Sequence, residues 1–126
     1  MLAPDIPVWW RFLDTWRSQY STIYYDCLLG GPVLTKEEER DPLKRGWRFN
    51  LSKRADAIAI TKTHVDIIEV ASDPGLRSIG QLQTYRALWL RDPAILLPER
   101  PVLVCEMIDQ DLLDAAGMYG LQVYII

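Results

Sequence analysis

Cysteine and histidine are scarce in this chain, which has two cysteines and one histidine among its 126 residues. With so few of them, and with no zinc-type spacing, there is no basis for a zinc site, a disulfide framework or a Ser-His-Asp triad. Cys27 and Cys105 lie in apolar runs, as buried free thiols do, which fits a reducing compartment. A chain of this length buries a core without disulfides or metals, so one domain spanning residues 1–126 is expected.

Long apolar runs and glycine-rich phosphate loops are also missing. No stretch approaches the roughly 20 apolar residues of a transmembrane helix, so no membrane association is expected. Asp5 and two prolines lie among the first residues, before the apolar run, which is not the pattern of a signal peptide. Secretion by a signal peptide is therefore not expected.

A large excess of positive charge is absent as well, because the net charge is -3, which argues against a dedicated nucleic-acid binder. The charge is unevenly distributed. Residues 36–62 carry eight Lys or Arg against five acids, whereas residues 63–126 carry four against nine. The basic part is either a phosphate-contacting surface or a solvated loop face, and its candidate DNA-binding residues are Lys44, Arg45, Arg48 and Lys53.

Hydrophobic periodicity and turn residues predict an α/β order of helix, strand, hairpin, helix, strand, helix, strand. In the first helix, Trp9 and Trp10 point about 100° apart, so either both are core or one faces a partner. Residues 35–46 predict a surface loop or short irregular helix, and Trp47 and Phe49 alternate with polar residues as in an edge strand. The expected helices cover 5–20, 76–90 and 109–120, and the strands 21–29, 54–60, 65–71, 101–107 and 121–126.

The pair of strands at 54–60 and 65–71 forms the clearest element, because residues 61–64 suit a hairpin turn. That register places Asp56 opposite Glu69 and Arg54 opposite Ala71, all on one face. Two carboxylates directly opposite repel each other unless a cation offsets them, and hard divalent cations take oxygen ligands. The pair is therefore either a cation site or two solvent-facing acids on a half-exposed sheet.

The opposite face of the same hairpin is small and apolar. It is expected to carry Ala55, Ala57 and Ala59 from the first strand, with Ile68 and Val70 from the second. Side chains this small allow a helix to pack closely against the sheet.

Asp56, Glu69 and the pair Gln81-x-x-x-Tyr85 resemble, in this order, the PD-(D/E)XK nuclease superfamily, especially its RecB-like branch. In that family an Asp and a Glu-x-Lys motif hold a divalent metal and activate water, and a Gln-x-x-x-Tyr helix follows. The resemblance covers residues 5–126. It implies an α/β sandwich, with a mixed sheet flanked by helices, whose helix, three antiparallel strands, helix and strand are followed by a C-terminal helix and strand.

Ala71 stands at the position of the family's lysine, which positions and activates the attacking water. A methyl group does neither, and loss of such a preorganised charge costs on the order of 10²–10³ in rate. Arg54 is the candidate replacement, because it lies opposite Ala71 in the predicted register. A guanidinium stays protonated, so it pairs with Asp56 or a phosphate but does not deprotonate water. In this reading Arg54 mainly neutralises the two acids.

The resemblance leads first to a degenerate, catalytically impaired nuclease fold that acts in protein interaction or as a structural part. Small self-standing domains of the superfamily occur in phage genomes, some beside head and neck genes, which suggests a phage particle component in the host cytoplasm or the virion. Its partners would be other phage structural proteins or further copies of the chain. Five tryptophans and six tyrosines favour such an interface.

Two alternatives involve DNA. In the first, the protein is an active endonuclease or exonuclease in which Asp56 and Glu69 hold Mg²⁺ or Mn²⁺, Arg54 replaces the lysine, and Gln81 and Tyr85 lie beside them. In the second, it binds DNA without cleavage through its basic stretch, and no cofactor is needed.

Overall fold

The computed structural model describes all 126 residues. Its elements are α1 (Ile6–Trp16), β1 (Thr22–Leu29), α2 (Pro42–Leu51), β2 (Lys53–Ile60), β3 (Val65–Val70), α3 (Leu76–Arg91), β4 (Glu99–Cys105), α4 (Gln110–Met118) and β5 (Gln122–Ile125), with short 3-10 turns at Ala3–Asp5, Arg17–Gln19 and Glu38–Arg40.

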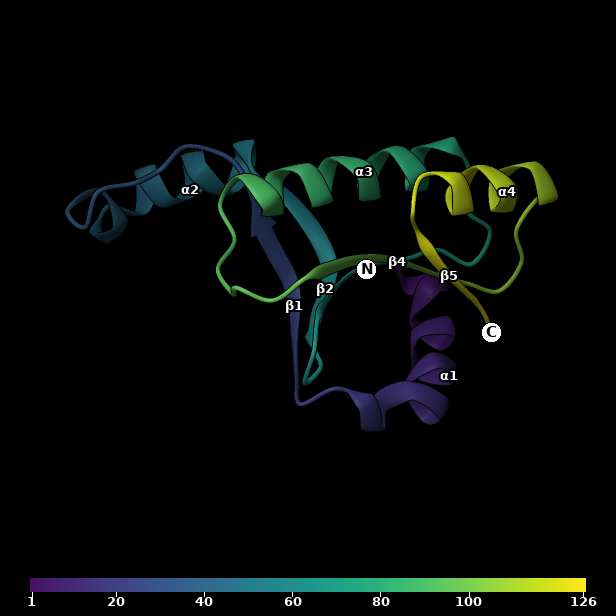
Figure 1. Cartoon of the computed structure of the whole chain (residues 1–126). Helices are drawn as coiled ribbons and strands as arrows, with labels where there is room; N and C mark the ends of the chain where they lie inside the picture. Colours follow the sequence, from purple (N-terminus) through teal and green to yellow (C-terminus); the bar gives the residue numbers. More distant parts are fainter.

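The strands form one sheet in the order β1-β2-β3-β4-β5. The pairs β1–β2 and β2–β3 are antiparallel, and the pairs β3–β4 and β4–β5 are parallel, so the sheet is mixed. Figure 1 shows α1 on one face of the sheet, α3 and α4 on the other, and α2 extending away from it. The α/β fold expected from the sequence is confirmed. No helix has the length and apolar character needed to cross a membrane.

The β2–β3 hairpin follows the predicted register. It pairs Ile60 with Val65 and stays in phase as far as Ala57. Thr61 organises the turn, because its hydroxyl accepts a hydrogen bond from the N–H of His64 (3.0 Å) while its own N–H donates to the His64 carbonyl (2.9 Å). A loop closed by these bonds leaves no freedom for a one-residue slip, which would turn every side chain to the other face.

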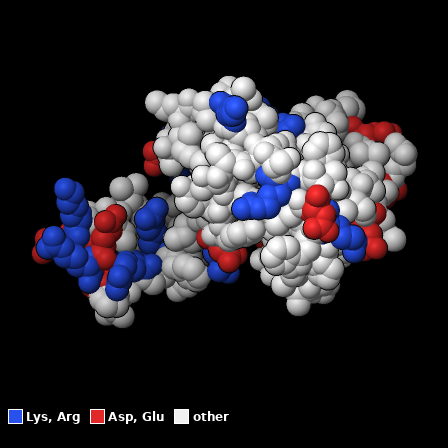
Figure 2. Space-filling model, turned by 90° about the horizontal axis from the view of Figure 1, so that it is seen from below, with Lys and Arg blue, Asp and Glu red and all other residues white.

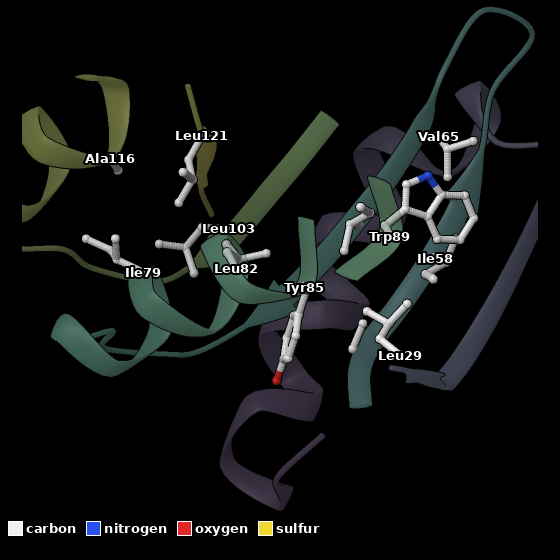
Figure 3. Close-up of a cluster of buried hydrophobic side chains, with 12 residues drawn as sticks. Leu29, Ile58, Val65, Ile79, Leu82, Tyr85, Trp89, Leu103, Ala116 and Leu121 are labelled. Carbon is white, nitrogen blue, oxygen red and sulfur yellow. The ribbon is translucent and has the colours of Figure 1, made fainter. Parts of the chain in front are cut away.

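Two apolar layers cover the sheet. On one side α1 packs Val8, Trp9 and Phe12 against Ala57 and Ala59 of β2, whose small side chains let the helix approach. Of the adjacent tryptophans, Trp9 is in the core and Trp10 faces outward, since Trp9 is 3% exposed and Trp10 is 61% exposed. Figure 3 shows the cluster on the other side, beneath α3 and α4, which includes Leu29, Ile58, Val65, Ile79, Leu82, Tyr85, Trp89, Leu103, Ala116 and Leu121.

The alternation of faces breaks where β1 and β2 pass through Asp26 and Asp56. Asp26 has a φ of 50°, which non-glycine residues seldom adopt. Beyond this point Cys27 and Ala55 pack with the α3-side cluster, whereas Ala57 belongs to the α1 side. The expectation that Ala55 shares a face with the other two alanines of β2 is therefore wrong, because the pleat is interrupted by this local twist.

A second correction concerns α2, where the sequence indicated an edge strand at Trp47 and Phe49. The segment is helical, and Asp41 caps it by accepting a hydrogen bond from the Leu43 N–H at 3.0 Å. Four residues of polar–apolar alternation are too few to separate a strand from a helix. The longer pattern is helical, since Leu43, Trp47 and Leu51 recur every four residues.

Asp66 of β3 is fully buried at the hairpin end of the sheet, on the α1 side. Arg100 donates to both carboxylate oxygens of Asp66 at 2.8 Å, and the Tyr20 hydroxyl donates at 2.6 Å. The His64 Nε2 lies 3.3 Å from the same carboxylate. A buried carboxylate with this many donors is well satisfied.

Removing Arg100 would leave Asp66 as a buried charge without its main partner. We expect Arg100→Ala to lower the free energy of unfolding by about 3–5 kcal/mol, measured by urea denaturation. Arg11→Ala is the matched control, because Arg11 and Glu106 form an exposed pair at 3.6 Å; its loss should be below about 1 kcal/mol. Equal losses in the two variants would contradict a stabilising role for the buried pair.

Candidate functional site

One hollow of about 440 Å³ lies at the end of the sheet where β2 begins, β3 ends and α3 passes over both. It is lined by the residues predicted for the site: Arg54, Asp56, Glu69, Ala71, Gln81 and Tyr85. Met1, Leu2, Asp5, Asp26, Val70, Arg77 and Ser78 complete the lining. The structure therefore brings together all residues that the hairpin register and the following helix placed on one face.

Local structure explains this convergence. Asp56 and Glu69 project from adjacent antiparallel strands, at positions that continue the β2–β3 register beyond Ala57. Gln81 and Tyr85 are four residues apart on α3, so both point toward the sheet from one face of the helix. Tyr85 is only 5% exposed, and its ring also belongs to the apolar cluster beneath α3.

Asp56 is held by two contacts. Its Oδ2 accepts a hydrogen bond from the Val70 N–H at 2.8 Å, and its Oδ1 lies 3.1 Å from the α-ammonium of Met1. The same ammonium lies 3.6 Å from Asp26. Burial lowers the pKa of this amino group, but its hydrogen bond to Asp56 and the charges of Asp56 and Asp26 outweigh burial, so its pKa is raised. The ammonium is therefore protonated at neutral pH and offsets the charge of Asp56.

Glu69 has no such support. Burial, followed by the nearby charge of Asp56, raises its pKa to about 8. One of its carboxyl oxygens, Oε2, is buried and has no hydrogen-bond partner. The same two acids, after burial, raise the pKa of Tyr85 to about 12. At neutral pH the side chains of Glu69 and Tyr85 are therefore both uncharged, and the Met1 ammonium remains beside Asp56.

Arg54 does not neutralise the two acids by contact, contrary to the expectation from the sequence. Its guanidinium lies 4.8 Å from the centre of the Phe49 ring, and it forms no ion pair within 4.0 Å of either carboxylate. The reason is the helical form of α2, which brings Phe49 to the start of β2, where the ring offers a cation–π contact.

The predicted DNA-binding residues do not line the hollow. Lys53 lines a neighbouring groove that shares Arg54, Gln81 and Tyr85 with the hollow. The remaining three, Lys44, Arg45 and Arg48, are on α2, the basic extension at the left of Figure 2. Their position makes them available for contacts away from the acids rather than beside them.

Several lining residues were missed by sequence reasoning. Arg77 lies in the first turn of α3, where a basic residue just after the Glu69 strand was a usable signal. Asp5 was not predictable, because its Oδ1 accepts from the Ser72 N–H at 2.9 Å, a contact between segments 67 residues apart. Asp26 lines the hollow at a point where β1 has a positive φ, a backbone conformation that no sequence pattern here predicted.

The hollow offers a divalent ion two facing carboxyl groups, those of Asp56 and Glu69. The chain has no group of three or more His, Cys, Asp or Glu side chains arranged to hold a metal. Of the two facing carboxyl groups, Asp56 already binds a backbone N–H and Glu69 keeps its proton at neutral pH. The Oε2 of Glu69 is a buried oxygen without a hydrogen-bond partner.

No protein-family model matches this chain, and no curated protein matches it. Among solved structures, the chain is similar to the crystal structure of a repair endonuclease from Pyrococcus abyssi, with a TM-score of 0.55 and 10% sequence identity. The match covers 100% of this chain and 47% of that one, so this chain spans about half its length. At this identity the likeness shows the fold alone, which is nuclease-like.

The raised pKa of Glu69 makes stability depend on pH. Between the ordinary pKa of 4.5 and the folded pKa of about 8, the unfolded chain releases a proton that the folded protein keeps. The free energy of unfolding should therefore fall as pH rises through this window, with a slope of at most about 1.4 kcal/mol per pH unit for one proton.

Glu69→Gln removes this titration, so its unfolding free energy should vary less between pH 5 and 8 and exceed that of the wild type at the upper end. Chemical denaturation at several pH values measures both. Glu106→Gln, at a largely exposed acid outside the hollow, is the control. Parallel curves for wild type and Glu69→Gln would show that Glu69 ionises normally in the folded protein.

Proposed function

We propose that this domain is a nuclease fold whose site is catalytically impaired, and that it acts as an interaction or structural component. One observation carries the proposal. The hollow that holds Asp56, Glu69, Gln81 and Tyr85 is lined by no lysine, and Ala71 presents a methyl group to it. The acids of the resembled family are present, whereas the cation that activates water there is not.

No neighbouring group replaces the lysine. Arg54 is engaged with the Phe49 ring, and Arg77 carries a guanidinium, a cation that cannot accept a proton from water. The α-amino group of Met1 is protonated and paired with Asp56. Glu69 keeps its own proton near neutral pH, so it is a poor base there. The hollow therefore has charge but no competent activator of water.

Exposed aromatic residues support the interaction role. Trp10 is 61% exposed, Trp47 46%, Tyr24 53% and Tyr25 51%. Tryptophan and tyrosine are enriched at protein interfaces, and an exposed apolar surface marks a site that a partner covers. The partner class we propose is protein, either a component of a phage particle, as the family resemblance suggests, or another copy of the chain. Location in the host cytoplasm or the virion belongs to the same proposal.

We expect the wild type to leave linear and circular DNA intact, single- or double-stranded, with Mg²⁺ or Mn²⁺. Ala71→Lys should gain metal-dependent cleavage of at least on the order of 10²-fold over the wild type, because it restores an ammonium in the hollow beside Asp56 and Glu69. Gel analysis of each substrate against time measures the gain.

The matched control is the double variant Ala71→Lys with Asp56→Ala, which keeps the new lysine and removes the carboxylate. It should be inert. Cleavage by the wild type that Asp56→Ala removes would contradict the proposal. A folded but inert Ala71→Lys protein would show that the site is remodelled beyond the lysine.

The second candidate function is a metal-dependent nuclease acting on DNA, and the unpartnered Oε2 of Glu69 favours it. A cation at this atom would satisfy a buried oxygen and lower the raised pKa of the carboxyl group. The likeness of the fold to a repair endonuclease supports DNA as the substrate class. Titration calorimetry with Mn²⁺ tests this candidate independently of cleavage: heat that Glu69→Gln abolishes would support it, and its absence would count against it.

A further inference from the structure

Helix α2 stands away from the rest of the molecule as an arm. Figure 1 shows it beyond the edge of the sheet, and the element it packs against most is the short turn Glu38–Arg40. At that end the Ser52 hydroxyl donates to the carbonyls of Gly30 (3.1 Å) and Arg48 (2.7 Å). The root of the arm is therefore fixed, while its length lies free of the body.

The arm carries an apolar stripe that its own chain leaves largely exposed. Leu43, Trp47 and Leu51 recur every four residues and lie on one face of the helix. They are 83%, 46% and 53% exposed. A helix of 10 residues is marginal in water by itself, because helices in proteins owe most of their stability to the burial of an apolar face. The stripe therefore calls for a partner surface.

The body of the same molecule offers an apolar groove of suitable character. It has a volume of about 440 Å³ and is lined only by hydrophobic residues, which include Tyr24, Cys27 and Ile95. It adjoins a second hollow through four shared residues: Leu28, Leu29, Trp89 and Ala94. That second hollow reaches Arg48 at the root of the arm. The groove is thus connected, through the second hollow, to the surface beside the C-terminal end of the arm.

Charge favours a second copy of the chain as the partner. Residues 42–54, which form the arm and the start of β2, contain five Lys or Arg and no acid. The rest of the chain carries all 17 Asp and Glu and the other nine of its 14 Lys and Arg. A basic arm and an acidic body are complementary between copies, and complementary charge steers such encounters.

Nucleic acid is the less suitable partner for the arm. The Lys44 ammonium lies 5.2 Å from the centre of the Trp47 ring and the Arg54 guanidinium 4.8 Å from that of Phe49, so cations already occupy faces on which bases would stack. Three glutamates and an aspartate, residues 37–39 and 41, directly precede the helix and would repel phosphates. Figure 2 shows acidic side chains beside the basic ones in the extension at the left.

We propose that two copies of this chain associate by exchanging arms, the Leu43–Trp47–Leu51 stripe of each lying in the groove along β1 of the other. Because arm and groove share one region of the surface, a single twofold axis satisfies both contacts and closes the assembly. The mode is a helix laid in a groove through anchors four residues apart. This inference rests on the interaction role proposed above and names its partner, but it does not involve the acidic hollow.

The experiment is a complementation test read by light scattering after gel filtration. The wild type should have about twice the chain mass of 14.5 kDa. Trp47→Glu removes the central anchor of the arm, and Ala94→Arg places a bulky cation in the groove; each should raise the dimer dissociation constant at least about 30-fold. Mixed together, the two variants should form a heterodimer, since one intact arm still meets one intact groove.

Met118→Glu is the matched control, because Met118 is 89% exposed at the far end of the molecule on α4 and should leave the dimer unchanged. Circular dichroism checks that each variant is folded. A wild type that stays monomeric at every concentration would overturn the proposal, and so would variants that fail to complement. An oligonucleotide bound by the monomer and lost in Trp47→Glu would assign the arm to nucleic acid instead. None of these outcomes depends on DNA cleavage, so the inference and the proposed function fail separately.

Discussion

Two carboxyl groups that face each other on neighbouring strands, largely out of water, impose the main constraint on this molecule. The turn at residues 61–64 sets the register that brings Asp56 and Glu69 together, and burial prevents water from screening their repulsion. The repulsion between the two carboxyl groups is relieved differently at each of them. Asp56 accepts a hydrogen bond from the Val70 N–H and pairs with the Met1 ammonium, whereas the raised pKa of Glu69 keeps that carboxyl group protonated at neutral pH. The electrostatics of the hollow therefore follow from the geometry of one hairpin.

The same hairpin contains a second buried acid, and the contrast between them is informative. Asp66, three residues before Glu69, receives two bonds from Arg100 and one from Tyr20, so its burial is matched by donors. Glu69 retains an oxygen with no hydrogen-bond partner, and its pKa is raised. Its burial therefore lowers the free energy of unfolding at neutral pH, and no hydrogen bond to Oε2 offsets that loss. Strongly shifted groups in a hollow mark functional sites more often than structural ones. The absence of a lysine at position 71 does not by itself explain why Glu69 remains buried with a raised pKa.

The features that the sequence could predict are those set by residues close together in the chain, and contacts between distant segments could not be predicted. The hairpin, its register and the shared face of Gln81 and Tyr85 follow from local periodicity, and the structure reproduces them. Ala55 departed from expectation because a twist at Asp26 interrupts the pleat. Asp5 and Met1 reach the hollow only through tertiary folding. Arg54 was misjudged because its real partner, Phe49, lies on a segment whose helical form four alternating residues could not indicate.

The arm and the hollow differ in where they place the basic side chains of this domain relative to Asp56 and Glu69. A nuclease that holds DNA at its acids needs cations aimed at the phosphates around them. Here three of the five cations of residues 42–54 are on α2, and two of the five lie over aromatic rings. A short helix with an uncovered apolar stripe gains its stability when another surface covers it. The positions of the basic side chains and the exposed Leu43–Trp47–Leu51 stripe thus both favour protein–protein association over DNA binding.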